Sequence, residues 1–157
     1  MKKMICCLLA LIALIAPATA EDVCESVRVA FEDGFSLSLP ADWVRYDVAP
    51  ELSEAGFIYC LGSADGARLM YVQRWNTGCA DLSELEASLS SRPEIELRTS
   101  VSDGESAGFL TYNFTDADCS GCATLFDGTV LNLLFLHQSD AENMLLAATI
   151  MESAGLE

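Results

Sequence analysis

Lysine is absent from this chain after residue 3. Of the eight lysines and arginines, six arginines remain beyond Lys2 and Lys3, against 24 aspartates and glutamates, so residues 21–157 carry a formal charge of 6 minus 24, or −18. Such a field repels phosphate backbones and anionic membrane surfaces, and it attracts cations. The acidic composition therefore excludes nucleic acid as an expected partner and favours a cationic ligand or a metal ion.

Long apolar runs are absent as well, except for residues 4–16. This run follows a basic start and covers about half of the roughly 20 residues that a membrane-spanning helix needs. The small residues Ala18 and Ala20 suit a signal peptidase site, so residues 1–20 are predicted to be the signal peptide of an exported protein, periplasmic or extracellular. No small-residue lipobox precedes Cys24, and we expect no stable membrane anchor after cleavage.

No linker interrupts residues 21–157, and a chain of this length suits one domain that buries about two thirds of its unfolded surface. Four Asp-Gly pairs, ending at Gly34, Gly66, Gly104 and Gly128, lie between apolar runs. Both residue types tolerate the positive φ of tight hairpin turns. The turns predict about eight strands, mostly antiparallel: residues 27–31 with 35–39, 57–61 with 68–75, 95–101 with 106–114, and 123–126 with 129–137.

The apolar pattern predicts which strands are covered. Apolar and polar residues alternate in residues 35–39 and 95–101, so each is expected to have one exposed face and to lie near the edge of the sheet. Residues 130–136 are apolar at every position except Asn132. We therefore expect the last strand to be central and covered on both faces.

Two capping-box sequences predict the helices that cover the sheet. Ser83 and Glu86 have this spacing at the start of the first helix, and Ser139 and Glu142 have it at the start of the second. Gly155 is placed to cap the end of the second helix. Because this helix is apolar over most of its circumference, we expect it to be pressed into the sheet.

The strand that runs into Pro40-Ala41-Asp42-Trp43, followed by a mid-chain helix, two late hairpins and a closing helix, resembles the PsbP-like α/β/α sandwich family. The resemblance covers about residues 27–154. It implies an α+β fold in which a largely antiparallel sheet lies between helices. It also implies a small exported protein that serves as a binding, assembly or accessory module, and it transfers no catalytic residue to this chain.

A Gly-x-Ser-x-Gly pattern around Ser106 matches the nucleophile elbow of serine esterases, and His137, the sole histidine, follows it in the chain order of those enzymes. An elbow needs a helix after the serine. Residues 109–114 are instead rich in aromatics and threonine and predict a strand. We therefore interpret this pattern as a hairpin turn, expect His137 to be a hydrogen-bonded structural imidazole, and expect the protein not to be an enzyme.

A second pattern, formed by Asp116, Asp118, Ser120 and Asp127, has the oxygen-ligand spacing of a calcium loop. Its closing residue is Asp instead of the longer Glu, and its flanks read as strands instead of helices. A polar loop between strands explains the same residues. No cofactor is expected, and calcium binding by these four residues is the alternative hypothesis.

Seven cysteines less the two before residue 20 leave five, so pairing within one chain leaves at least one free. Cys119 and Cys122 are candidates for a local disulfide worth about 2 kcal/mol, or for idle thiols. No helix follows them to activate a redox thiol, and no second Cys-x-x-Cys completes a zinc site. A two-residue turn at Gly66 places Cys60 opposite Tyr71, which leaves Cys24 with Cys79 as a further candidate pair.

Residues 40–56 form the longest stretch without clear periodicity, and loops on a rigid scaffold often carry recognition. Trp43 and Tyr46 in this stretch are the candidate ligand-binding side chains. The alternative is that Trp43 packs beneath the loop, because tryptophan is usually mostly buried. The sequence thus predicts an exported, non-catalytic binding or accessory module whose protein or small-molecule ligand it does not identify.

Overall fold

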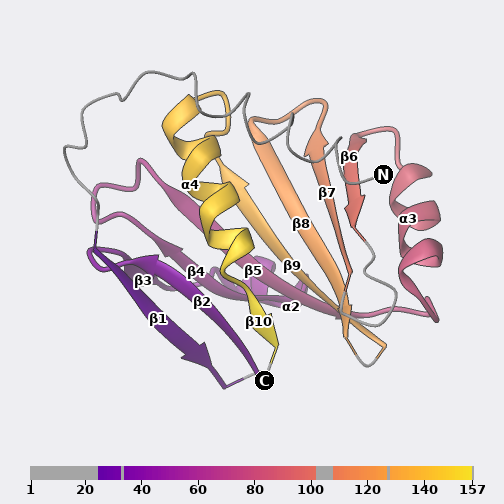
Figure 1. Ribbon diagram of the computed structural model, residues 1–157, viewed down its shortest axis with the longest axis horizontal. Coiled ribbons are helices and arrows are strands. Elements are labelled where there is room, and N and C mark those ends of the chain that lie inside the picture. Colours follow the sequence, from indigo (N-terminus) through magenta and orange to yellow (C-terminus); the bar gives the residue numbers. More distant parts are fainter. Residues whose placement is uncertain (1–24, 33, 102–107, 127, 157) are drawn as a thin grey trace, which may run out of the picture.

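The computed structural model describes residues 25–32, 34–101, 108–126 and 128–156, which form two sheets and three helices (Figure 1). The strands are β1 (Ser26–Phe31), β2 (Phe35–Pro40), β3 (Val44–Tyr46), β4 (Phe57–Gly62), β5 (Leu69–Asn76), β6 (Ile95–Val101), β7 (Phe109–Phe114), β8 (Cys119–Phe126), β9 (Thr129–Leu136) and β10 (Gly155–Leu156). The helices are α2 (Pro50–Glu54), α3 (Leu82–Ser90) and α4 (Ala141–Glu152).

The large sheet has seven antiparallel strands in the order β3-β4-β5-β9-β8-β7-β6. The predicted central strand is confirmed, because β9 is the fourth of the seven. Leu133 and Phe135 pack on one face of it, whereas Val130 and Leu134 pack on the other. β6 lies at the edge of this sheet, as its alternating pattern predicts.

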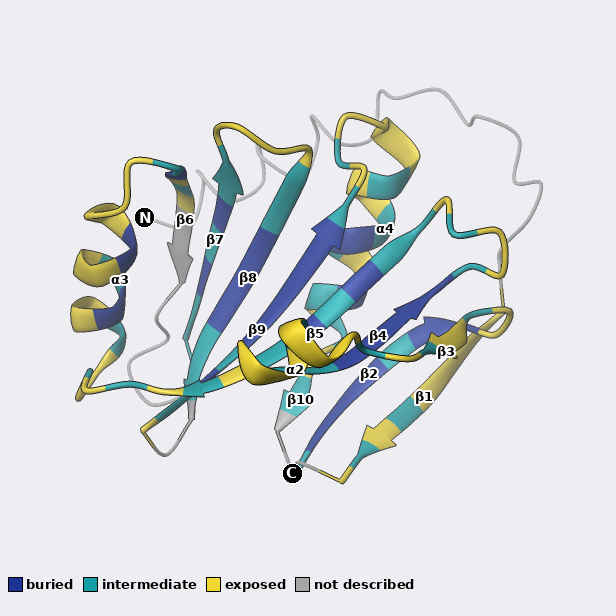
Figure 2. Cartoon of the chain, turned by 180° about the vertical axis from the view of Figure 1, so that it is seen from behind, coloured by how far each residue is buried: buried dark blue, intermediate teal, exposed yellow. Residues whose placement is uncertain are grey.

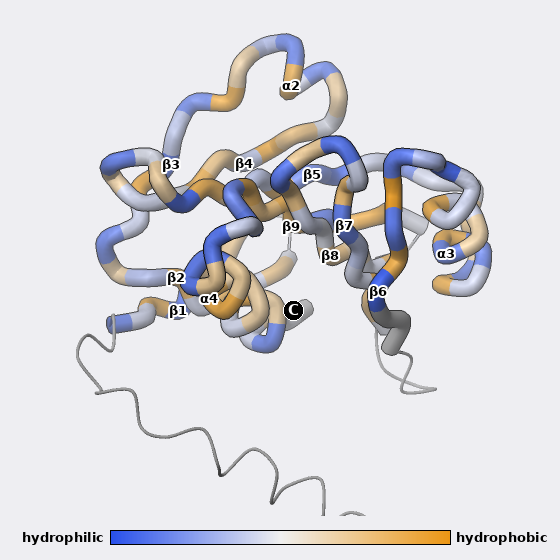
Figure 3. The backbone as a smooth tube through the Cα atoms, turned by 90° about the horizontal axis from the view of Figure 1, so that it is seen from above, coloured by the Kyte–Doolittle hydropathy of each residue, from blue (hydrophilic) through white to orange (hydrophobic). Residues whose placement is uncertain are grey.

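Helices lie on both faces of the large sheet. Leu85 and Leu89 of α3 pack on one face, while Ala147 and Ile150 of α4 pack on the other, where the small sheet also lies (Figure 3). The α+β class and the predicted α/β/α layering are thus confirmed. The strands are divided between two sheets, however, because the first hairpin pairs with β10 instead of joining the large sheet.

The small sheet has the order β1-β2-β10, so β2 is its middle strand. The prediction that the serines of this strand face solvent is wrong. Ser36 is fully buried, and its Oγ lies 2.7 Å from Nη2 of Arg28. The backbone N–H of Ser38 donates to Oγ of Ser153 at 2.8 Å. The end of α4 and the neighbouring strands therefore cover the polar side of β2.

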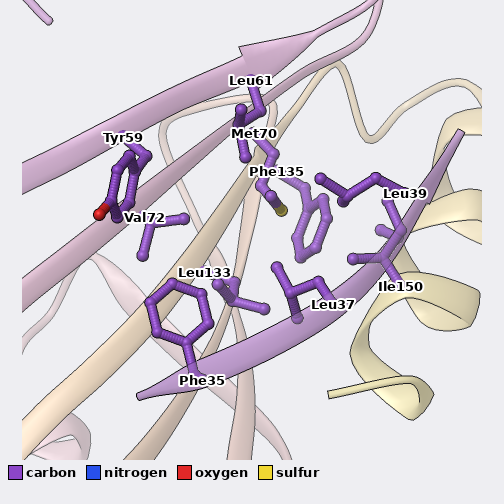
Figure 4. Packing of buried hydrophobic residues seen from close by; sticks show 11 residues of the cluster. Phe35, Leu37, Leu39, Tyr59, Leu61, Met70, Val72, Leu133, Phe135 and Ile150 are labelled. Atoms are coloured by element: carbon purple, nitrogen blue, oxygen red, sulfur yellow. The ribbon is translucent and has the colours of Figure 1, made fainter. Parts of the chain in front are cut away.

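The main core lies between the small sheet and the large one. Leu37 and Leu39 of β2 point across this space toward Met70 and Phe135, with Ile150 of α4 beside them (Figure 4). Each such side chain contributes roughly 1.5–3 kcal/mol when it is fully buried. β1, β3 and α2 are mostly exposed, and the buried residues concentrate in the central strands (Figure 2). The core therefore joins the two sheets and α4 into one unit.

Both predicted capping boxes are displaced from the real helix starts. Asp81 caps α3 by accepting from the N–H of Glu84 at 3.0 Å. Asp140 caps α4 by accepting from the N–H groups of Glu142 and Asn143 at 2.8 and 3.2 Å. An aspartate directly before the helix can reach these donors, so it takes the position that the sequence pattern gives to Ser83 and Ser139.

The end of α4 also differs from the prediction. Ser153 caps the helix, and Gly155 begins β10 instead. Only Ala147 and Ile150 of α4 are buried, whereas Met144 and Leu145 are 57% and 70% exposed. The prediction that α4 is pressed into the sheet is therefore confirmed for one side of the helix only. One side of the helix packs in the core, and an apolar side remains at the surface.

Two local predictions about strands are confirmed. Cys60 lies opposite Tyr71 in the β4–β5 hairpin, although the connection is longer than two residues. Residues 109–114 form β7, so the segment after the Gly-x-Ser-x-Gly pattern is a strand and not a helix. Ser106 itself lies outside the described residues.

Candidate functional site

A hollow lies beside the C-terminal half of α4, where this helix faces β7, β8 and β9. It has a volume of about 420 Å³. Most of its lining is apolar, and α4, the first half of β2 and the large sheet all contribute to it. The lining residues are Phe35, Leu37, Phe109, Cys122, Thr124, Leu131, Leu133, Met151, Glu152, Ala154 and Gly155.

A second hollow of about 200 Å³ continues along the same helix. Met151 lines both hollows, and Met144 and Ala148 line the second one. These three residues are spaced by four and three positions, so they lie on one side of α4. We name the two hollows together the α4 groove.

The floor of the α4 groove follows from strand alternation. Phe109 lies opposite Thr124, and Thr111 lies opposite Cys122, so these four side chains share the face toward α4. The residues between them, such as Leu110, face α3 and are buried there. The small sheet covers the strands on the other side of α4, so among the described residues no second layer lies above this part of the large sheet (Figure 1).

The charges at the α4 groove are few. Glu152 is the charged residue of the larger hollow, and it is exposed. Arg98 lines the smaller hollow and pairs with Glu96 at 3.4 Å. The Asn113 amide satisfies its hydrogen bonds when its oxygen faces Arg98, at 3.2 Å from Nε and 3.0 Å from Nη2. Arg98 is therefore already compensated, whereas Glu152 has no ion-pair partner among the described residues.

Cys122 is the one thiol in the lining of the larger hollow. Burial raises its pKa to about 12. The side chain is therefore a protonated thiol at neutral pH, and a thiol is a poor nucleophile compared with a thiolate. Cys119 is similar, because burial and the nearby Asp118 carboxylate raise its pKa to about 11.

Of the two alternatives predicted for Cys119 and Cys122, a local disulfide or idle thiols, the disulfide does not form. Both cysteines are free, and both lie in β8. Three residues of extended strand separate Cα atoms by about 10 Å, beyond the roughly 7 Å limit for a disulfide. The strand also points the two side chains to opposite faces of the sheet. The sequence predicted a strand only from residue 123, whereas β8 begins at Cys119, so both cysteines lie in extended backbone.

The remaining cysteines do not form a site with these two. Cys60 is buried and free, and burial raises its pKa. Cys79 is free among the described residues, with its sulfur 3.0 Å from Oγ1 of Thr77. Cys24 lies outside the described residues, so its pairing with Cys79 stays a prediction.

The residues of the predicted calcium loop are not brought together by the described structure. Asp118 accepts hydrogen bonds from the backbone N–H and the hydroxyl of Ser139, at 2.5 and 2.8 Å. Ser120 lies in β8, 3.1 Å from Oε1 of Gln138, while Asp116 is exposed in the turn before the strand. Asp127 lies outside the described residues.

An eight-residue strand spans about 26 Å, so a loop around one ion is replaced by an extended segment. Within the described ranges, no three His, Cys, Asp or Glu side chains are grouped to hold a metal ion.

Trp43 and Tyr46 lie away from the α4 groove. The Tyr46 hydroxyl donates to the Ser63 carbonyl at 2.6 Å. Trp43 is half-buried, packs against the main core and lines another hollow of about 480 Å³ between β1, β2, β3 and β4. The Arg45 guanidinium lies over the Tyr59 ring in this hollow, 4.6 Å from its centroid. Whether Trp43 or Tyr46 contacts a ligand stays a prediction.

His137 differs from the expected hydrogen-bonded structural imidazole, because its hydrogen bonds to the described residues are made by its backbone. It is exposed and has a φ of 58°, which few residues other than glycine adopt. Its backbone N–H donates to the Asp118 carbonyl at 2.9 Å, and its carbonyl accepts from Asn143 at 3.1 Å. The backbone of His137 therefore shapes the turn between β9 and α4.

The sequence interpretation did not identify the α4 groove. The available signal was the composition of α4, which is apolar on more sides than one packed layer can cover. A helix of this kind indicates either complete burial or an apolar surface. Only the placement of the small sheet, on one side of α4, distinguishes the two.

Comparison with known proteins supports the fold. The solution structure of cyanobacterial PsbP from Synechocystis sp. PCC 6803 is similar to this chain, with a TM-score of 0.59 and 14% sequence identity over 91% of this chain and 99% of that one. No family model and no curated protein sequence matches the chain. Among the described residues, no helix has both the length and the apolar character to cross a bilayer. The chain therefore has the PsbP-like fold, in an α+β arrangement.

Proposed function

We propose that the protein is an exported, non-catalytic binding module that holds an apolar peptide segment of a partner protein in the α4 groove. The observation that carries this proposal is an apolar hollow of about 420 Å³ that continues into a smaller hollow lined by the exposed Met144. Single exposed apolar residues are normal, but a contiguous apolar surface around a hollow marks an interaction site.

The size and chemistry of the larger hollow support binding. Ligand sites usually have volumes of about 300–1,000 Å³ and are mostly apolar with a few polar groups. The larger hollow falls within this range, and Glu152 and Thr124 are the charged and hydroxyl groups of its lining. The Thr124 hydroxyl already donates to the Gly108 carbonyl at 2.7 Å, so Glu152 remains for a ligand.

The shape of the groove favours a peptide segment. Met144 lines the smaller hollow, Met151 lines both, and the two residues are seven positions apart, which is about 10 Å along a helix. An extended peptide advances about 3.3 Å per residue, so about four residues span the stretch from Met144 to Met151, where the two hollows meet. Two apolar side chains of one segment could therefore fill the two hollows together.

The groups in the groove support a role without catalysis. Cys122 is held as a protonated thiol by burial, which raises its pKa to about 12. The hydroxyls of Thr124 and Ser120 are engaged with the Gly108 carbonyl and the Gln138 amide. None of these three groups is therefore held as a nucleophile beside a general base, as nucleophilic catalysis requires.

A displayed library of random peptides tests this function. Peptides are selected on the wild-type domain and then measured on Ala154→Trp, which places an indole in the larger hollow. Ala87→Trp on the exposed side of α3 is the matched control. We expect selected peptides to lose at least about tenfold in affinity on Ala154→Trp and to keep their affinity on Ala87→Trp.

Thermal unfolding of both variants verifies that each is folded before binding is measured. Selected peptides that bind Ala154→Trp as tightly as wild type would place recognition elsewhere and overturn the proposal. A library that yields no binder would overturn it as well.

A further inference from the structure

We infer that the peptide segment bound in the α4 groove is basic as well as apolar, and that Glu152 is the counter-ion of its positive charge. This inference rests on the proposed function, because it names the chemistry of the same ligand. It is carried by the position of Glu152 at the rim of the larger hollow, at the C-terminal end of α4.

Glu152 is available to a ligand. It is exposed and has no ion-pair partner among the described residues. Arg28 is the cation that reaches the same end of α4, but its guanidinium donates to the Ser153 carbonyl and lies 2.7 Å from Ser36 Oγ. The carboxylate therefore lies beside an apolar hollow with its charge uncompensated by these neighbours.

Glu152 does not stabilise the end of α4 on which it lies. A helix has its negative dipole end at its C-terminus, where an acidic side chain is unfavourable. The last turn of α4 contains Glu152 and no basic residue. A residue that opposes local stability beside a hollow is the kind of exception that functional sites show.

The electrostatic field of the whole chain is negative, like the charge of Glu152. The chain has a formal net charge of −16, and Arg98 at the other end of the groove is paired with Glu96. The carbonyl end of α4 and the Glu152 carboxylate therefore both attract a cation toward the apolar hollow. A peptide with an arginine or lysine next to its apolar side chains satisfies both the hollow and the charge.

The groove-dependent peptides of the library provide the probe. One of them is synthesised together with a copy in which each arginine or lysine is glutamine. Both are titrated against wild type, Glu152→Gln and Glu86→Gln. The last variant removes the same charge from α3, on the opposite face of the large sheet.

We expect groove-dependent peptides to be enriched in basic residues. Glu152→Gln should weaken the basic peptide roughly three- to fivefold and reduce its salt dependence, as the loss of one exposed ion pair does. The glutamine copy should bind wild type and Glu152→Gln equally. Glu86→Gln should change the affinity of the basic peptide little.

Groove-dependent peptides without basic residues would refute the inference and leave the proposed function intact. An equal loss in Glu86→Gln would also refute it, since the attraction would then come from the net charge of the whole protein. Peptides that do not depend on the groove at all would instead contradict the proposed function.

Discussion

Gly121 lies so close to Tyr112 that a methyl group at its Cα would come within 2.2 Å of Cζ of the ring. Tyr112 cannot move aside easily, because it is buried and its hydroxyl donates to Oδ1 of Asn132 at 2.9 Å. Phe114 also packs against it edge-on, with ring centroids 5.7 Å apart. The backbone of β8 therefore approaches β7 at a place where only glycine fits.

We expect Gly121→Ala to destabilise the fold by about 1–3 kcal/mol, the usual cost of overpacking a filled core. Gly78→Ala is the matched control, because no atom lies within 4 Å of the added methyl group. Urea unfolding of the two variants measures the difference. An equal, small effect at both positions would show that Tyr112 is free to shift.

Tyr112→Phe should cost about 1–3 kcal/mol, because it leaves a buried acceptor on Asn132, which is 1% exposed, without its donor. Tyr46→Phe removes a similar bond to the Ser63 carbonyl near the surface, where water can replace it. The loss there should be smaller. Equal losses in urea unfolding would indicate that burial of the bond does not determine its contribution.

Asp140→Ala should destabilise the protein by about 0.5–2 kcal/mol, because it removes the acceptor for two N–H groups at the start of α4. Asp140→Asn keeps an acceptor oxygen and should remain within a few tenths of a kcal/mol of wild type. Thermal unfolding of the pair tests the cap. A loss in the asparagine variant as large as that in the alanine variant would argue that the charge, and not the bond, matters.

Stability should fall in alkaline solution because of Cys122. Its thiol has an ordinary pKa of 9.0 when unfolded and of about 12 when folded, because burial disfavours the thiolate. Between these values the unfolded chain binds fewer protons, so the free energy of unfolding decreases as pH rises from about 9 toward 12.

Cys122→Ala should flatten this decrease in unfolding experiments at pH 8 to 10.5. Thr124→Ala alters the same hollow without removing an ionisable group, and it should keep the wild-type slope. A slope unchanged by Cys122→Ala would mean that other groups cause the loss.

The predicted export can be tested on the full chain. Expression in a bacterial host with a Sec pathway should yield a product that begins at Glu21, because Ala18 and Ala20 suit the signal peptidase. Intact-mass measurement of the periplasmic fraction gives the cut. Ala20→Arg should retain the uncut precursor, and a wild-type product that keeps residues 1–20 would contradict the prediction.

Much of the fold is readable from neighbouring residues. The hairpin from β8 to β9, the central position of β9 and the strand at residues 109–114 were all predicted from turn residues and apolar periodicity. These signals are local, because a turn of a few residues and a repeat of two determine them. Even so, the sequence placed the helix caps at Ser83 and Ser139 instead of Asp81 and Asp140, because several residues with acceptor side chains stand close together at each helix start.

The candidate site was not readable in this way. Cys119 and Cys122 suggested a local disulfide or idle thiols, and the α4 groove was missed, although the helix was predicted to be apolar over most of its circumference. The sequence does not show which side of an apolar helix is covered. That depends on elements distant in the chain.

By itself, the amino-acid order determined the α+β class and the pairing of the strands within each predicted hairpin, because turns and periodicity act between near neighbours. The tertiary structure alone decided that the strands form two sheets and that the α4 groove stays open. Both depend on contacts between distant segments, such as the bond from Ser38 in β2 to Ser153 after α4, more than 100 residues apart. Packing of this kind is set by the whole folded chain and leaves no local pattern.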